Sequence, residues 1–235
     1  MNQDILSESF FEALTGGDRA RARTIMKQFG AVVGSPQRVI EELVWPTYEH
    51  VDKLFRADQL SQIAHQFATR LLRVLAEHLS SQLPKSAPNG TTVVAFCGGT
   101  ESDELAAQMA VDTLEASGYS VSFAGGGVPS DEIVGHVHET RPDVLLLFAS
   151  AASDLPGVRT IIQTLRTING SPTTKIAVGG GVFNRAQGLA EELEADMYAS
   201  TPLELAQGLS GNGRKAPAMV EAQAPARTKR RLRAA

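Results

Sequence analysis

The chain has 235 residues, of which 43% are hydrophobic, and a formal net charge of −4 at pH 7. This length suits one large or two small globular domains, and the acidic balance excludes an overall attraction to nucleic acid. The single cysteine, Cys97, excludes an internal disulfide and a cysteine-based zinc cluster, and no apolar run is as long as a membrane span. The first residues lack a basic segment followed by an apolar one, so we expect a cytoplasmic protein.

Residues 1–83 have a helical pattern of apolar side chains and are predicted to form a four-helix bundle. Ser9 and Glu12 fit a capping box, so we expect a short helix to begin there. Asp18 suits the cap of a second helix. Pro46 lies inside the third helix and should kink or split it. The expected helices are a short one from Ser9, then roughly 19–29, 36–55 and 61–83.

Residues 84–90 contain two prolines and a glycine, which predicts a linker. From residue 91 to about 209 strands alternate with helices, and this order implies a parallel sheet with right-handed crossovers. The fold class is therefore α/β: an N-terminal four-helix bundle followed by a flavodoxin-like, Rossmann-like domain of five strands in the order 2-1-3-4-5. The expected strands are 91–96, 119–124, 144–148, 175–178 and 197–199, and the expected helices are 104–117, 130–140, 153–168, 186–194 and 202–209.

Residues 210–235 are rich in alanine, proline and basic side chains, and this composition predicts a disordered tail. The basic run 229–231 could contact an acidic partner or nucleic acid, but so short a run is more often a solvated segment. We expect no direct nucleic-acid binding apart from this tail.

Glycine or small residues follow each of the first four predicted strands. They are Gly98 and Gly99, the triplets 125–127 and 179–181, and the run 149–153. A βα turn often holds one glycine for geometry alone, but so many at the carboxyl edge of one sheet favour a ligand crevice. Neither a dinucleotide-binding nor a P-loop spacing follows the strands, and no catalytic acid–base or nucleophile set is apparent.

The order and spacing of several short segments resemble the cobalamin-binding family, in which a helical bundle precedes a flavodoxin-like domain and the corrinoid lies between them. The resemblance covers about 6–209 and is carried by segments 92–109, 123–129, 141–144, 153–156, 178–184 and 195–199. It implies cobalamin as the cofactor, with another tetrapyrrole such as a bilin or heme as the alternative. The cofactor-binding residues that it implies are Gly98, Gly99, Thr100, Glu101, Ser102, Asp103, Leu105, Gly126, Ser150, Ser153, Leu155, Gly179, Gly180, Tyr198 and His65.

The chain departs from the family's signature loop, D-x-H-x-x-G, whose histidine ligates cobalt. Glu101, Asp103 and Ala106 stand in the places of its aspartate, histidine and glycine. A carboxylate is a poorer cobalt ligand than imidazole and would repel the phosphate of the cofactor's tail. The metal ligand is therefore open: cobalamin with its own base on the metal, a different tetrapyrrole and a vestigial site are the alternatives.

His65 is the bundle residue that matches photosensing relatives, which place a Glu-His pair over the cofactor. Ala64 stands at the glutamate position. A lone histidine on an apolar helix is more often a core or boundary residue than a ligand.

The resemblance implies that Gly179 and Gly180 make room for the nucleotide tail of the cofactor and that Ser150 or Ser153 hydrogen-bonds it. A side chain at Gly180 would fill that space or force an unfavourable φ. We therefore expect Gly180→Leu to abolish ligand binding and to leave the fold intact, whereas Asp103→Ala should hardly weaken binding.

Three functions are compatible with the sequence. The lack of a catalytic set favours a cobalamin-binding sensor or regulator, without catalytic activity of its own, that acts through a protein partner. The alternative is a corrinoid methyl carrier of a methyltransferase system, against which the missing histidine at Asp103 counts. The third is an interaction scaffold without cofactor. Whether the chain is an enzyme and whether it forms homo-oligomers are left open.

Overall fold

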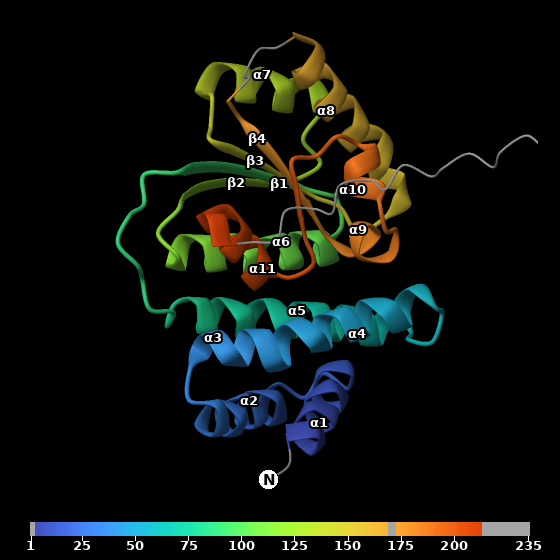
Figure 1. Cartoon of the computed structure of the whole chain (residues 1–235). Coiled ribbons are helices and arrows are strands. Elements are labelled where there is room, and N and C mark those ends of the chain that lie inside the picture. The colour runs from blue at the N-terminus through green and yellow to red at the C-terminus, as the bar shows by residue number, and fades with distance from the viewer. Residues whose placement is uncertain (1–2, 169–172, 213–235) are drawn as a thin grey trace, which may run out of the picture.

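A computed structural model describes residues 3–168 and 173–212. It consists of a helical bundle stacked against a five-stranded sheet that has helices on both faces (Figure 1). The fold class predicted from the sequence is confirmed. None of the helices in the described ranges is long and apolar enough to cross a membrane.

The first helix of the bundle is longer than predicted. It begins at Gln3, so Ser9 and Glu12 lie inside it and the predicted capping box is wrong. Leu6 extends the buried face by one turn before Phe10, which explains the earlier start. Asp18 caps the second helix as predicted. The helices of the bundle are α1 (Gln3–Thr15), α2 (Arg19–Val33), α3 (Pro36–Val39), η1 (Ile40–Val44), α4 (Trp45–Arg56) and α5 (Gln62–Ser80).

Pro46 does not break the third helix, because a π-helical turn directly before it takes up the misfit. Segments α3, η1 and α4 follow one another without a gap, and the N–H of Trp45 donates to the carbonyl of Ile40, five residues earlier. Proline lacks an N–H, and its ring clashes with the carbonyl that a regular α-helix would place beside it. A π turn is a recognised way to accommodate such a residue within a continuous helix.

The sheet has the order β2-β1-β3-β4-β5 with all pairs parallel, as predicted. The central strand β3 is buried at every position. The register of β1 against β2 shifts between Ala95 and Cys97, and Cys97 then pairs with Gly126. The strands are β1 (Thr92–Cys97), β2 (Ser120–Gly126), β3 (Val144–Phe148), β4 (Lys175–Gly179) and β5 (Met197–Ala199).

Helices cover both faces of the sheet (Figure 1). One face carries α6 (Glu101–Ala116) and α11 (Pro202–Gln207), and the other carries α7 (Ser130–Thr140) and α8 (Leu155–Ile168). The helix predicted over 186–194 is instead two short helices, α9 (Gly181–Arg185) and α10 (Leu189–Glu192). A last helical turn is η3 (Gly208–Asn212), and it includes the start of the predicted tail. The prediction of disorder is therefore wrong for residues 210–212. Residues 213–235 of the predicted tail lie outside the described residues.

Two hydrophobic cores hold these layers together. The first runs from the bundle through α6 to one face of the sheet, and Leu72, Leu105 and Leu146 belong to it. The second lies between the other face and α7 and α8, and Leu145 belongs to it. Because successive residues of β3 enter opposite cores, the strand is apolar throughout. The bundle therefore shares one core with the sheet domain.

Candidate functional site

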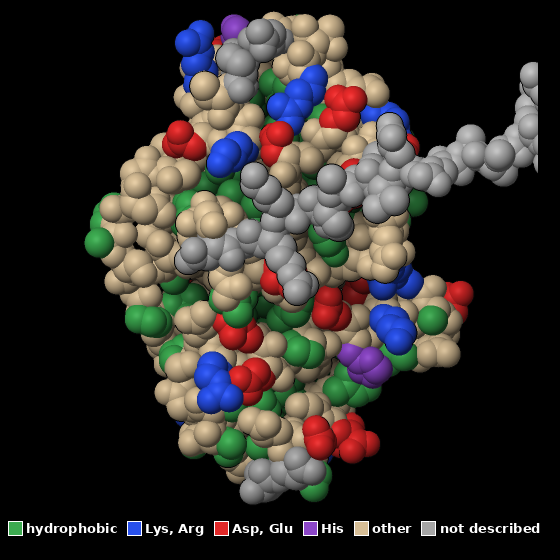
Figure 2. Space-filling view, viewed as in Figure 1, with side chains coloured by type: hydrophobic (Ala, Val, Ile, Leu, Met, Phe, Trp, Pro, Cys, Tyr) green, Lys and Arg blue, Asp and Glu red, His purple; other side chains and the backbone are tan. Residues whose placement is uncertain are grey.

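Polar contacts join the bundle to the carboxyl edge of the sheet. From α4, Glu49 accepts a hydrogen bond from Asn184 Nδ2, beyond the end of β4, at 3.2 Å. From α5, Arg73 pairs with Glu104 in the first turn of α6, with an N···O distance of 3.3 Å. On the face shown in Figure 2, acidic and basic side chains gather along this junction. Helices α4 and α5 therefore lie next to the sheet edge at which the sequence predicts a ligand crevice.

Asp103, which stands where the family places its cobalt ligand, is part of a helix cap. Helix α6 begins at Glu101, earlier than predicted, so this segment is a helical turn rather than the expected open loop. Thr100 Oγ1 donates to Asp103 Oδ2 at 2.6 Å, and the N–H of Asp103 donates to Thr100 Oγ1 at 3.1 Å. The N–H of Thr100 also donates to Asp103 Oδ2, at 3.4 Å, so the two side chains form a capping box that satisfies two amide groups at the start of the helix. Asp103 is 1% exposed, and its Oδ1 has no hydrogen-bond partner among the described residues.

Three buried hydroxyl groups meet where β1 and β3 end. Tyr48, from α4, approaches Ser102 and Ser150. Burial raises the pKa of the Tyr48 phenol, and the two serine hydroxyls partly oppose that rise, so the phenol is neutral near pH 7. Ser150 Oγ makes no hydrogen bond of good geometry within the described part of the chain. The cluster retains hydrogen-bonding capacity for a ligand.

Two arginines from different layers come together over Gly181. A Cβ on this glycine would lie 2.7 Å from Arg185 Nη1 and 3.9 Å from Arg56 Nη1. Arg185 Nη2 donates to the carbonyl of Ser150 at 2.6 Å, and Arg56 forms an ion pair with Asp52. Burial lowers the pKa of Arg56, and the charge of Arg185 lowers it further. Arg185 thus brings to the edge of the hydroxyl cluster a positive charge that has no ion-pair partner among the described residues.

Backbone packing accounts for two of the glycines predicted to bind the cofactor. A Cβ on Gly126 would lie 2.2 Å from the carbonyl oxygen of Gly98. A Cβ on Gly180 would lie 2.3 Å from the carbonyl oxygen of Ala149, and Gly180 has a φ of +102°. The expectation that Gly180→Leu leaves the fold intact is therefore wrong, because the side chain would collide with backbone rather than with open space.

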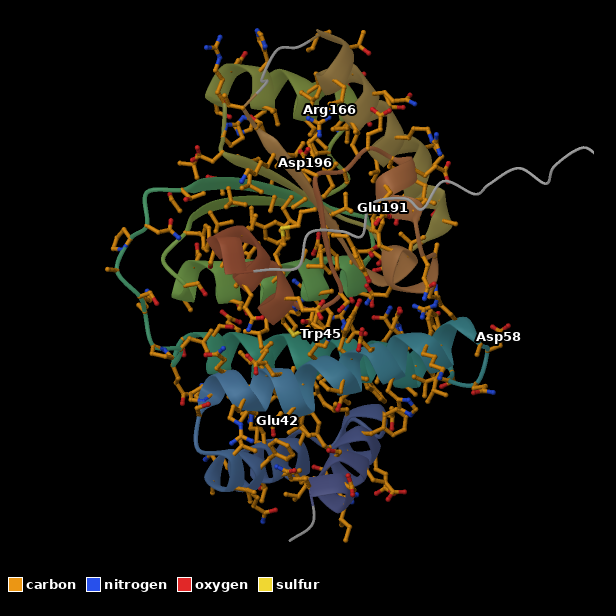
Figure 3. All side chains as sticks on the ribbon, in the orientation of Figure 1. Glu42, Trp45, Asp58, Arg166, Glu191 and Asp196 are labelled. Atoms are coloured by element: carbon orange, nitrogen blue, oxygen red, sulfur yellow. The ribbon has the colours of Figure 1, made fainter. Side chains whose placement is uncertain are left out.

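The space beside Gly179 is smaller than the nucleotide tail that it is expected to receive. The cavity there measures about 10 Å³ and is lined in part by Trp45, Phe148 and Ala199. This is room for one water at most. Trp45 also lines a cavity of about 390 Å³ between the bundle and helices α6 and α11 (Figure 3). A tail beside Gly179 would require side chains to move.

The other predicted site residues divide into two groups. Gly98 lies beside the carboxylate of Asp103, because a Cβ on it would lie 2.6 Å from Asp103 Oδ2. Tyr198 is at the same edge, where its hydroxyl donates to Asn184 Oδ1 at 2.8 Å. The others do not converge on the cluster. Leu105 and Leu155 pack in the hydrophobic cores, and Ser153 is exposed in the 3-10 turn η2 (Ala152–Asp154). Gly99 has no described atom within 4 Å of a Cβ position.

His65 is a buried imidazole on α5. It is 8% exposed and stacks on Phe55, with ring centroids 3.9 Å apart. Burial lowers its pKa, and the charge of Glu101 opposes this shift. Neither ring nitrogen has a hydrogen-bond partner among residues 3–168 and 173–212. Within the same ranges no group of three or more His, Cys, Asp or Glu side chains could hold a metal ion.

Sequence reasoning missed Tyr48, Glu49, Arg56 and Arg185. The first three are ordinary positions on an amphipathic helix, and their partners lie far along the chain; Glu49 and Asn184 are 135 positions apart. The segment 178–184 carried part of the resemblance and ends next to Arg185, which was the one local signal that could have drawn attention to it.

Comparison with known proteins gives matches along most of the chain. One B12 binding domain model matches residues 91–206, and a second matches residues 6–80. Dimethylamine corrinoid protein 1 of Methanosarcina acetivorans is 25% identical over 171 residues, which are 72% of this chain and 79% of the relative. Dimethylamine corrinoid protein 2 of the same organism is 24% identical over 174 residues, 73% and 80% of the two chains. The structure of Methanosarcina barkeri monomethylamine corrinoid protein has the same fold, with a TM-score of 0.77 and 17% identity over 89% of this chain and 98% of that one.

Proposed function

Because the chain belongs to the B12-binding domain family, we propose that it is a corrinoid protein that carries methyl groups in a methyltransferase system. The observation that carries this proposal is the match, over nearly three quarters of the chain, to dimethylamine corrinoid proteins. The sequence-based preference for a sensor or regulator is wrong, because these relatives are corrinoid proteins rather than regulators. The match to a B12 binding domain makes cobalamin or a related corrinoid the cofactor, in preference to a bilin or heme.

The chain's part in such a reaction is to hold and orient the cofactor. A bound corrinoid would supply a cobalt centre that accepts a methyl group and gives it up. The hydroxyls of Tyr48, Ser102 and Ser150 lie where they can hydrogen-bond the polar rim of a ligand at the sheet edge. Helix α4 covers this edge and would limit access of water.

The cluster fits the periphery of a corrinoid better than it fits a protein ligand to cobalt. Ser150 Oγ and Asp103 Oδ1 are buried and without a hydrogen-bond partner in the described structure, so both could bind polar groups. Asp103 Oδ2 is held by Thr100, and a carboxylate is a poor match for cobalt. We therefore assign no described side chain to the metal.

A methyl carrier works with protein partners, and we infer at least one enzyme that loads the methyl group and one that removes it. The polar junction between α4, α5 and the sheet edge is the part of the surface next to the proposed cofactor. Partners would therefore approach the protein from that side. The oligomeric state stays open.

Two measurements test the proposed function. The protein purified from a cobalamin-supplied host should be coloured and show corrinoid absorption bands. After reduction of the bound corrinoid, a methyltransferase supplied with mono-, di- or trimethylamine should change those bands as the methyl group arrives. A colourless protein that also fails to take up hydroxocobalamin would favour the scaffold. A coloured protein that no methyl donor changes would leave corrinoid binding in place and overturn the carrier role.

A further inference from the structure

We propose that the basic segment of this chain, residues 213–235, binds in the cavity of about 390 Å³ between the bundle and helices α6 and α11. In this arrangement Met219 and Val220 contact the apolar wall of the cavity, and the basic side chains contact carboxylates around it. The proposal concerns contacts within the chain and does not rest on the proposed function. It assigns an occupant to a cavity that the candidate site does not use.

The wall of this cavity is largely apolar. Ile40 and Trp45 line it from the bundle, Pro84 from the segment that links the bundle to the sheet domain, and Leu203 from α11. Its volume lies within the range in which proteins enclose ligands. Apolar side chains that leave water and cover such a wall stabilise the bound state. The cavity therefore suits a short apolar stretch of chain.

The basic segment begins beside this cavity. Tyr119 Oη and Ser210 Oγ lie 3.3 Å apart, and Ser117, two positions before Tyr119, lines the cavity. Met219 follows Asn212, the last described residue, by seven positions. Seven extended residues span up to about 25 Å. Met219 and its neighbour Val220 are therefore within reach of the cavity.

The charge of the basic segment is opposite to that of the remaining chain. Residues 213–235 contain seven Lys and Arg side chains and one Glu, so they carry a net charge of +6. Residues 1–212 then carry −10 of the formal net charge of −4. A basic segment that is tethered to an acidic body has a high effective concentration at its surface. Opposite charge therefore favours binding within the chain.

Carboxylates without an ion pair lie in or next to the cavity wall. Glu41 lines the cavity, and Glu115 and Glu204 are sequence neighbours of the lining residues Ala116 and Leu203. Among the described residues these three carboxylates form no ion pair; Glu41 accepts a hydrogen bond from the neutral side chain of Gln37 at 2.8 Å. Lys85 is the opposing charge in the lining, so carboxylates are in excess.

Disulfide formation within the full chain tests where the basic segment binds. Met219→Cys is combined with Ser86→Cys or Ser117→Cys, which place the second thiol in the cavity lining, or with Glu132→Cys on α7 as the control. The native Cys97 stays in all variants, because its thiol has a pKa of about 12. Oxidised glutathione should close each cavity pair about tenfold faster than the control pair, since binding raises the local thiol concentration. Peptide mapping identifies the disulfides, and circular dichroism verifies folding.

Charge reversal tests the electrostatic part of the proposal. In the Met219→Cys, Ser86→Cys variant, Glu41→Lys together with Glu115→Lys should slow disulfide formation about tenfold, to the rate of the control pair. Glu8→Lys together with Glu139→Lys changes the net charge equally on α1 and α7 and should leave the rate unchanged.

Three results would overturn the proposal. The first is an equal rate for the cavity pairs and the control pair. The second is an equal effect of the two double charge reversals, because only a contact at the cavity distinguishes them. The third is a disulfide that joins two molecules, which would assign the cavity to the basic segment of a second copy. A bound corrinoid is not needed for any of these measurements, so they do not depend on the proposed function.

Discussion

Thr100 and Asp103 exchange two hydrogen bonds across the start of helix α6: the hydroxyl donates to Oδ2 at 2.6 Å and the Asp103 N–H donates to the hydroxyl at 3.1 Å. The residue at the family's metal-ligand position therefore has a local structural role. This role accounts for the placement of Oδ2 without invoking a metal.

Replacing Asp103 with alanine should lower stability and leave the spectrum of a bound corrinoid unchanged. Loss of the cap should cost about 1 kcal/mol of the free energy of unfolding, measured in urea. Thr100→Ala is the matched variant, and it should cost more, because it leaves the buried carboxylate without its shortest hydrogen bond. A spectral change in Asp103→Ala that is absent from Thr100→Ala would identify Asp103 as a metal ligand.

Replacing Gly180 with alanine should destabilise the fold even without a ligand. The positive φ and the collision with the Ala149 carbonyl should together cost at least about 2 kcal/mol. Gly99→Ala is the control, since no described atom lies within 4 Å of its Cβ position. Thermal unfolding of the cofactor-free proteins compares the two. Equal melting temperatures would mean that the loop between β4 and α9 relaxes freely, contrary to this explanation.

His65 should make the protein less stable in acid. Its folded-state pKa is lowered by burial, so below the unfolded value of about 6.5 the unfolded chain binds more protons and stability falls as pH falls. His65→Leu should remove this part of the pH dependence between pH 7.5 and 5. The exposed His78 gives the control variant His78→Gln. Urea titrations at both pH values measure the free energy of unfolding. If this free energy changed with pH in His65→Leu as much as in the wild type, the prediction would be contradicted.

Cys97 should react slowly with thiol reagents in the folded protein. Burial, with the charge of Asp103 as the next cause, raises the pKa of its thiol to about 12. Compared with an ordinary cysteine of pKa near 8.5, the thiolate fraction at pH 8 falls by about a thousandfold. Because Cys97 is the single cysteine, alkylation can be followed on the whole protein, with the urea-unfolded chain as the reference. Similar rates in the two states would contradict the predicted pKa.

The parallel sheet and its strand order could be predicted because their signals are local. Each strand is a short apolar run, and the alternation with helices leaves few ways to connect five parallel strands. The cap at Asp18 was predictable for the same reason, since its acceptor and donor lie three residues apart. The resemblance added the cofactor class, and the two B12 binding domain matches support it.

Local signals failed where a residue's role depends on a distant neighbour. The layers and the strand order could be read from the sequence, whereas the edge at which a ligand binds stays a prediction. Only the tertiary structure decided that Gly180 is required by the Ala149 carbonyl and that Arg56 meets Arg185. Hydrophobic periodicity specifies which face of a helix is buried, but it does not specify the polar residues that come together when two helical layers pack. Those contacts form only when the bundle and the sheet share a core, and they define the candidate site.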